Sequence, residues 1–180
     1  MRPIIITGGP GAGKTTLVNA FAKQGIMTFE EGSRYLIEQQ SQLDAGILPW
    51  TNLPGFARLC LQLMNQQKQQ AYNHPIAFMD RAIPDICAYL KVGGCEVGAE
   101  YVASCADYHS QVFVCRPEAS IYVQDEIRPH SFEEALQIHD TLIETYRELG
   151  FDVIEVPWGS ITQRVQFIAM TLGFVLNDIC

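Results

Sequence analysis

A glycine-rich stretch near the start of the chain carries the residue pattern with the most definite chemistry. Residues 8–15 read Gly-Gly-Pro-Gly-Ala-Gly-Lys-Thr, which fits the pattern G-x-x-x-x-G-K-[ST]. Glycines let several backbone N–H groups converge on a polyphosphate, because side chains would block that approach. In this pattern the lysine, here Lys14, reaches the β- and γ-phosphates, and the hydroxyl of Thr15 binds Mg²⁺. The residues expected to hold the nucleotide are Gly8, Gly9, Pro10, Gly11, Ala12, Gly13, Lys14, Thr15 and Thr16.

The sequence on both sides of this P-loop supports the same interpretation. An apolar run over residues 3–7 precedes it and is typical of a buried strand, and a helix is expected over about residues 13–23. That helix would point its free N–H groups and the positive end of its dipole at the same phosphates. The alternative is a glycine-rich turn with an unrelated lysine, which this context strongly disfavours. Binding of a nucleoside triphosphate is therefore the first functional prediction.

A second pair of polar residues, Asp80 and Arg81, ends the apolar run 76–80. Ligands of open α/β sheets bind beyond the carboxyl ends of the strands. Asp80 is a candidate to hold Mg²⁺ or to accept a proton from an attacking hydroxyl, and Arg81 to clamp an anionic group. In the alternative, Asp80 caps the next helix and Arg81 is its surface partner. We favour Pro84 as the start of that helix, which leaves Asp80 and Arg81 in the preceding loop.

Glu31 and Arg34 follow the apolar run 26–30 and lie three residues apart at an expected helix start, so they share a face. Glu31 is a candidate to bind or deprotonate an acceptor hydroxyl, and Arg34 to hold the acceptor's phosphate or carboxylate. The alternative, weighed equally, is that acidic residues here simply favour a helix N-terminus.

The segment 116–130 follows the apolar run 111–115 and lacks clear periodicity. It carries Arg116, Asp125, Arg128 and His130. A mobile arginine-bearing loop suits phosphoryl transfer, because it excludes water and neutralises transition-state charge. Arg128 is the favoured catalytic arginine, while His130 and His139 are expected to be structural. The alternative is a solvated loop whose charges have no role.

Five apolar runs, over residues 3–7, 26–30, 76–80, 111–115 and 152–156, alternate with helical patterns such as 55–72 and 132–149. This alternation predicts a parallel α/β sheet. Capping boxes of Ser131 with Glu134 and of Ser160 with Gln163 are expected to begin two helices, and Gly150 to end one. Residues 46–55 and 173–180 are interpreted as a loop and a short extension, and the turn 157–160 as a candidate border of the nucleotide base.

Composition sets limits on function. The chain has 180 residues, which is typical of one domain, and a net charge of −8, which argues against nucleic acid as the main partner. Its six cysteines form no C-x-x-C pair, so we expect buried, reduced thiols rather than a zinc site. With no signal peptide and no run long enough for a membrane span, the protein is expected to be cytoplasmic.

Together these motifs resemble a known family. They are similar to those of the kinase-like AAA-labelled P-loop ATPases. The motifs are the P-loop, E-x-x-R at Glu31 and Arg34, DR-x-x-PD from Asp80, "IYVQDEIR…SFEEALQIHD…YRELG" and a last strand followed by "VP". That group is related to the ribosylnicotinamide kinase domain of the bacterial NAD regulator. The resemblance covers about residues 2–170.

The resemblance implies a three-layer α/β fold of nucleotide-kinase type, a five-stranded parallel sheet of order 2-3-1-4-5, ATP and Mg²⁺ as ligands, and a lid after the fourth strand. The residues that it carries over are Gly8 to Thr16, Glu31, Arg34, Asp80, Arg81, Asp125 and Arg128. In the family, more than one arginine often stands near Arg128, whereas here Pro129 and His130 follow it.

Three functions fit these residues. The leading one is a kinase that transfers the γ-phosphate of ATP to a small-molecule acceptor. Its catalytic candidates are Lys14, Glu31, Asp80, Arg81 and Arg128. Thr15 and Asp80 are the candidates to bind the metal, and Glu31, Arg34, Asp80 and Arg81 are the candidates to bind the acceptor. The second is an ATPase or nucleotide-dependent switch that acts on a partner protein. A non-catalytic nucleotide sensor is disfavoured, because Lys14, Thr15 and Asp80 are all present.

Overall fold

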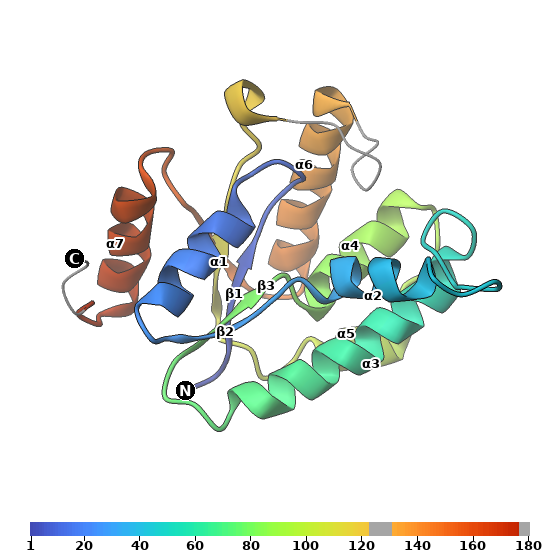
Figure 1. Cartoon of the computed structure of the whole chain (residues 1–180), viewed down its shortest axis with the longest axis horizontal. Coiled ribbons are helices and arrows are strands. Elements are labelled where there is room, and N and C mark those ends of the chain that lie inside the picture. Colours follow the sequence, from blue (N-terminus) through green and yellow to red (C-terminus); the bar gives the residue numbers. More distant parts are fainter. Residues whose placement is uncertain (123–130, 177–180) are drawn as a thin grey trace.

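A five-stranded parallel sheet forms the centre of the molecule (Figure 1). The computed structural model describes residues 1–122 and 131–176. The strands are β1 (Ile4–Thr7), β2 (Met27–Phe29), β3 (Ala77–Asp80), β4 (Gln111–Val114) and β5 (Asp152–Glu155). They pair in the order β2-β3-β1-β4-β5. The parallel sheet and the strand order implied by the family resemblance are both confirmed.

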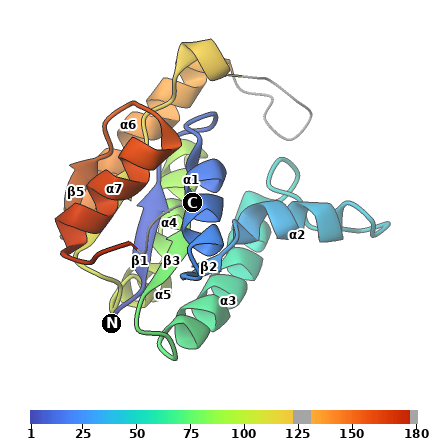
Figure 2. The same cartoon turned by 60° about the vertical axis from the view of Figure 1, so that its left-hand side comes forward.

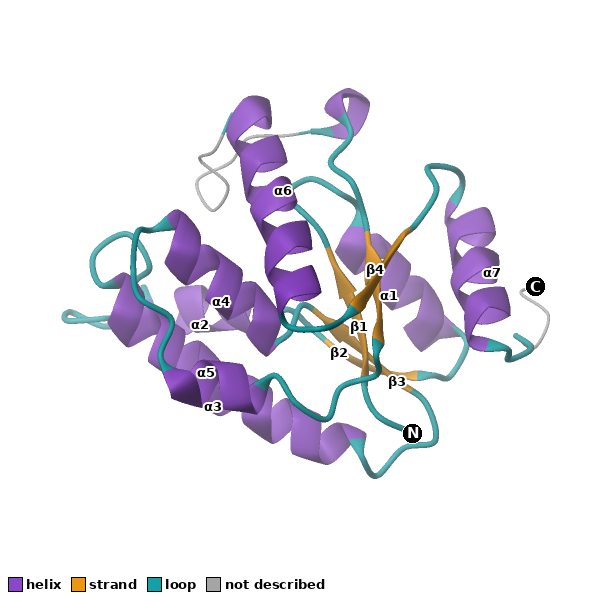
Figure 3. Ribbon diagram, turned by 180° about the vertical axis from the view of Figure 1, so that it is seen from behind, coloured by secondary structure: helices purple, strands orange, loops and turns teal. Residues whose placement is uncertain are grey.

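Helices cover both faces of the sheet, and this explains the continuous apolar runs of its central strands. Ile4 and Ile6 pack beneath α1 (Lys14–Lys23) and α7 (Ile161–Leu172) on one face. Ile5, between them, points into the opposite layer of α3 (Leu53–Ala71), α4 (Ile83–Val92), α5 (Ala99–Ser104) and α6 (Phe132–Glu148). Figure 2 shows α1 and α7 side by side, and Figure 3 shows the other layer from behind. A strand buried on both faces needs no polar alternation.

Several helix ends follow the expected chemistry. The side chains of Ser131 and Ser160 each accept a hydrogen bond from the backbone N–H three residues further on. In return, the side chains of Glu134 and Gln163 accept hydrogen bonds from the backbone N–H groups of the two serines. Gly150 follows α6 with φ of 84°. Pro84 lies in the first turn of α4, whose first helical residue is Ile83. These four predictions are confirmed.

The segment 46–55 is the clearest difference from the predicted elements. Helix α3 begins at Leu53, inside the stretch interpreted as a loop. The side chain of Asn52 accepts a hydrogen bond from the Gly55 N–H at 3.0 Å, and Pro54 occupies the first turn. A proline in the first turn of a helix sacrifices no internal hydrogen bond, so Pro54 fits inside α3 although its stretch was interpreted as a loop.

Helix α2 (Gly32–Gln40) follows β2 and packs against α3. The short α5 and the 3-10 turn Ala119–Ile121 were not predicted, because six and three residues are too few to show a helical period.

Four cysteines, Cys60, Cys87, Cys105 and Cys115, are buried as unpaired thiols, as predicted, and Cys95 is half-buried. Over residues 1–122 and 131–176, no helix is both long enough and apolar enough to cross a bilayer.

Candidate active site

The glycine loop lies at the carboxyl end of β1, and two of its glycines are required by close contacts. Gly8 has φ of 138°, and a Cβ there would stand 1.9 Å from the carbonyl oxygen of Cys115. Gly11 has φ of 73°, and a Cβ there would stand 2.4 Å from the ring of Tyr122. The loop backbone is thus enclosed by its neighbours, and side chains at these positions would force it out of shape.

Lys14, the first residue of α1, is buried, and its ammonium group lies over the loop. Its Nζ donates a hydrogen bond to the carbonyl oxygen of Gly9 at 3.1 Å. Burial lowers the pKa of this ammonium, and the nearby Arg81 lowers it further, although Glu31 and Asp80 oppose them. A polyphosphate in the loop would favour the charged form of Lys14, so the geometry suits the binding of an anion.

Asp80, at the end of β3, turns toward the first residues of α1. Its Oδ2 accepts a hydrogen bond from the Thr15 hydroxyl at 2.8 Å, while its Oδ1 is buried without a partner in the described structure. Burial is the main cause that raises the pKa of this carboxyl. A buried, unpartnered carboxylate oxygen beside a threonine hydroxyl fits the oxygen ligands of Mg²⁺.

The described residues contain no group of three or more His, Cys, Asp or Glu side chains that could hold a metal ion alone. Mg²⁺ takes much of its coordination from phosphates and water, so the Thr15 and Asp80 pair remains compatible with it.

Arg81 is buried in the short connection between β3 and α4. It is 5% exposed, and its Nε and Nη1 donate to Glu31 and Asp85, each at 3.0 Å. Its guanidinium carbon lies 5.4 Å from the ring centre of Tyr89. The φ of 65° at Arg81 is unusual for a side-chain-bearing residue and directs the guanidinium between these groups. The alternative that made Arg81 a surface partner of Asp80 is therefore wrong.

Asp85 ends the DR-x-x-PD pattern, but the sequence analysis assigned no role to it. It is 2% exposed, and it accepts hydrogen bonds from the Thr7 hydroxyl, the Ala82 N–H at 2.9 Å and the Tyr146 hydroxyl at 2.6 Å, besides Arg81. It also performs the capping of α4 that the alternative assigned to Asp80. The signal in the sequence was an acidic residue directly after Pro84, in the first turn of a helix.

Glu31 and Arg34 both line the same pocket but engage different partners. Glu31 accepts hydrogen bonds from the Ser33 hydroxyl and from Arg81. The Arg34 side chain is 46% exposed, and its Nε lies 3.3 Å from Glu38 on the next turn of α2. The structure therefore places Glu31 inside and Arg34 at the mouth.

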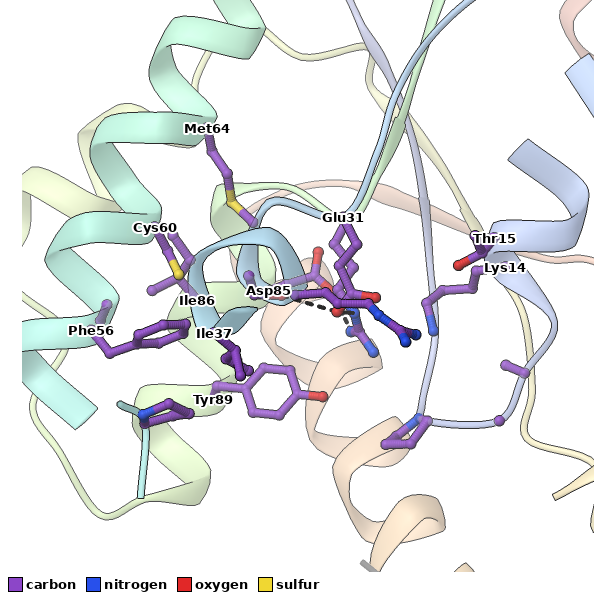
Figure 4. Close-up of a pocket in the computed structure, with 18 of the residues that line it drawn as sticks. Lys14, Thr15, Glu31, Ile37, Phe56, Cys60, Met64, Asp85, Ile86 and Tyr89 are labelled. Carbon is purple, nitrogen blue, oxygen red and sulfur yellow. Dashed lines mark hydrogen bonds and ion pairs between the residues drawn. The ribbon is translucent and has the colours of Figure 1, made fainter. Parts of the chain in front are cut away.

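The pocket has a volume of about 530 Å³ and runs from the glycine loop to the layer of α2, α3 and α4. Figure 4 shows Lys14 and Thr15 on one side, Glu31 and Asp85 in the middle, and apolar side chains on the other side. Those apolar side chains are Ile37, Phe56, Cys60, Met64, Ile86 and Tyr89. One cavity thus joins a phosphate-binding loop to a second, mainly apolar compartment.

Two further side chains hold the loop backbone from behind. Arg164 of α7 is 3% exposed, and its Nη2 donates to the carbonyl oxygen of Ala12 at 3.3 Å. Its guanidinium carbon lies 5.4 Å from the ring centre of Trp158, in the turn predicted to border the base. His139 of α6 is fully buried, and its Nδ1 accepts the Gly9 N–H at 3.4 Å.

The lid segment is described only in part. Arg116 is exposed at the end of β4, and the Tyr122 ring packs edge-on against Phe132 with centres 5.4 Å apart. The predictions for Asp125, Arg128, Pro129 and His130 lie outside the described residues.

A glycine-rich phosphate loop after the first strand of a 2-3-1-4-5 parallel sheet defines a P-loop protein of the nucleotide-kinase fold. The chain belongs to the family whose model AAA_28, described as an AAA domain, matches residues 3–164. No curated protein matches the chain.

Solved structures share this fold at low sequence identity. A deoxyadenosine kinase from M. mycoides is 17% identical with a TM-score of 0.65, and the match covers 95% of this chain and 98% of that one. The NadR protein in complex with NR is 19% identical with a TM-score of 0.72 over 99% of this chain and 54% of NadR. A shikimate kinase from Acinetobacter baumannii is 18% identical with a TM-score of 0.59, over 96% and 94% of the two chains.

Proposed function

We propose that the protein is a kinase that transfers the γ-phosphoryl group of ATP to a hydroxyl group of a small molecule. The observation that carries this proposal is the continuous pocket, in which the glycine loop and the carboxylate of Glu31 face one cavity. The structural neighbours named as deoxyadenosine and shikimate kinases support a phosphotransferase on this fold. An enclosed pocket suits an acceptor that must be held in line with the phosphate and shielded from water.

In the proposed reaction, the acceptor oxygen forms a bond to the γ-phosphorus, the bond from that phosphorus to the β,γ-bridging oxygen breaks, and ADP leaves. Lys14 neutralises charge on the β- and γ-phosphates, and the loop N–H groups orient them. Glu31 accepts the proton of the acceptor hydroxyl. Arg81 orients Glu31 through the 3.0 Å bond to its carboxylate. Thr15 and Asp80 would hold Mg²⁺, which supplies charge neutralisation at the phosphates when it is bound.

The test measures ATP consumption by the purified protein with and without a panel of hydroxyl compounds, with mass spectrometry of the products. Acceptor-dependent ADP formation with a phosphorylated product supports the kinase. Steady hydrolysis without any acceptor, or hydrolysis that starts only when a partner protein is added, overturns it in favour of the ATPase or switch.

Two variants sharpen this test. Glu31→Gln removes the proton acceptor but keeps an oxygen for Arg81, so we expect transfer to fall about 10²-fold or more while basal hydrolysis changes little. Glu144→Gln alters an exposed carboxylate on α6 that does not line the pocket and serves as the matched control. Full acceptor-dependent transfer by Glu31→Gln would overturn the assignment of Glu31.

A further inference from the structure

The charges and apolar side chains of the second compartment define the class of acceptor that the pocket admits. We infer that the acceptor is an alcohol without phosphate or carboxylate groups, whose uncharged, ring-containing body rests on the apolar wall formed by Ile37, Phe56, Cys60, Met64, Ile86 and Tyr89. This inference rests on the proposed function, because it describes the acceptor side of the same pocket.

Among the described residues, three cations line the pocket: Lys14, Arg34 and Arg81. Arg81 is enclosed between Glu31 and Asp85, which together offset its charge. Lys14 lies over the glycine loop and is required there by the nucleotide phosphates. Arg34 stands at the mouth beside Glu38, where solvent weakens its attraction for an anion.

An anionic acceptor would therefore enter a compartment that offers it no unpaired cation within the described structure. It would also lie close to Glu31 and Asp85, both of which line the pocket. Burying a charge without a partner is strongly unfavourable, and a nearby like charge adds to the cost. A neutral acceptor escapes both penalties, so the electrostatics select for an uncharged body.

The opposite wall is apolar and remains uncharged at neutral pH. Phe56, Cys60 and Met64 of α3 are at most 5% exposed overall, and Ile86 and Tyr89 of α4 line the same apolar side of the pocket. Burial raises the pKa of the Cys60 thiol to about 12, so this group stays neutral. Two aromatic side chains, Phe56 and Tyr89, are among the lining residues and offer apolar contact to a ring.

The polar groups of the compartment lie at one end of it. In Figure 4, Glu31 and Asp85 lie between the apolar wall and the Lys14 side of the pocket. An acceptor with a hydroxyl at one end and an apolar ring at the other would place the hydroxyl by Glu31 and the ring by Phe56 and Tyr89. This arrangement matches the polarity of the acceptor to that of the pocket.

A binding experiment can use the two tryptophans of the chain, Trp50 and Trp158. Trp50 lines the pocket, whereas Trp158 stacks on Arg164 at the other side of the glycine loop. In a Trp158→Phe variant saturated with MgADP, fluorescence reports acceptor binding while the phosphate loop is already filled. The probes are the uncharged ring alcohols thymidine, deoxyadenosine and pyridoxine, with their phosphate monoesters thymidylate, dAMP and pyridoxine 5′-phosphate as anionic counterparts.

We expect at least one uncharged probe to bind about tenfold or more tightly than its anionic counterpart. The inference is overturned if no uncharged probe binds more tightly than its anionic counterpart, or if none of the three ring alcohols binds at millimolar concentration. Phosphorylation of an anionic acceptor would overturn the inference and leave the proposed kinase intact. Steady ATP hydrolysis that no alcohol stimulates would overturn the kinase, and with it the acceptor that this inference describes.

A charge placed on the wall gives a second, independent test. Ile37→Lys adds a cation at a half-buried position that lines the pocket, and we expect it to improve the binding of thymidylate relative to thymidine by about tenfold. Tyr35→Lys adds the same charge two residues away, at an exposed position outside the pocket lining, and is the matched control. An equal change in both variants would contradict a local charge effect.

Discussion

The two halves of the pocket are built in opposite ways. The phosphate half is made of backbone: a short glycine loop, held from behind by Arg164 and His139. The other half, which we propose binds the acceptor and call the acceptor half, is made of side chains from α2, α3 and α4, and Asp85 holds its buried cation, Arg81. A backbone site depends on a local sequence pattern, whereas a side-chain site depends on contacts between distant segments. The phosphate half can therefore be recognised in a sequence, while the acceptor half can change its specificity without altering the loop.

The largest expected effect separates the two halves. Lys14→Ala removes the ammonium from the phosphate half, so we expect turnover to fall about 10²- to 10³-fold. Binding of a ring alcohol, followed by Trp50 fluorescence without nucleotide, should remain within about twofold. Lys23→Ala, at the exposed end of the same helix, is the control. If Lys14→Ala abolished alcohol binding as well, the two halves would not be independent.

The next effect should fall on the buried support of the acceptor half. Asp85→Asn places an amide among four donors, namely the Thr7 and Tyr146 hydroxyls, the Ala82 N–H and Arg81. Because Arg81 loses a buried counter-charge, we expect the free energy of unfolding in urea to fall by about 3 kcal/mol or more. Asp140→Asn, on the exposed side of α6, should change it by less than about 0.5 kcal/mol. Equal stability of the two variants would show that Asp85 does not hold the acceptor half together.

A smaller effect tests the support behind the loop. Arg164→Met keeps the buried aliphatic stem but removes the donor to the Ala12 carbonyl. A hydrogen bond from a charged group contributes about 1.5–3 kcal/mol, so we expect the KM for ATP to rise about tenfold or more with a smaller change in kcat. Arg164→Lys should restore part of the affinity. Gln166→Met, exposed on the same helix, is the control. A fall in kcat alone, with KM unchanged, would contradict a role in holding the loop.

The smallest effect is a pH dependence of stability. Burial is the main cause that lowers the pKa of His139 from its ordinary 6.5, so the unfolded chain takes up this proton more readily than the folded one. The contribution of neutral His139 is therefore complete above pH 6.5 and is lost as pH falls through the lower, folded value. His139→Asn keeps an acceptor for the Gly9 N–H but does not titrate. Between about pH 7 and 5 we expect its unfolding free energy to fall less steeply than that of the parent protein. Parallel curves would mean that His139 titrates normally.

The sequence was informative where cause and effect lie close together along the chain. The glycine loop, the five strands and the capping boxes each depend on a few adjacent residues, and the resemblance supplied the strand order. The roles of Asp85 and Arg164 were not predicted, because their hydrogen-bond partners are distant in sequence. Thr7 lies 78 positions from Asp85, and Ala12 lies 152 positions from Arg164. Only the folded sheet brings these pairs together. Helix α3 was placed too late because Pro54 reads as a breaker unless its position in the first turn is known.

The hydrogen bonds around Asp85 also constrain how this protein can evolve. Thr7, Arg81 and Tyr146 come from three separate segments, and each satisfies part of one buried carboxylate. A change at any of the four positions leaves a buried group unpaired, so neutral drift at one of them is blocked until another changes with it. Lineages of this family are therefore expected to inherit the four residues as a single unit.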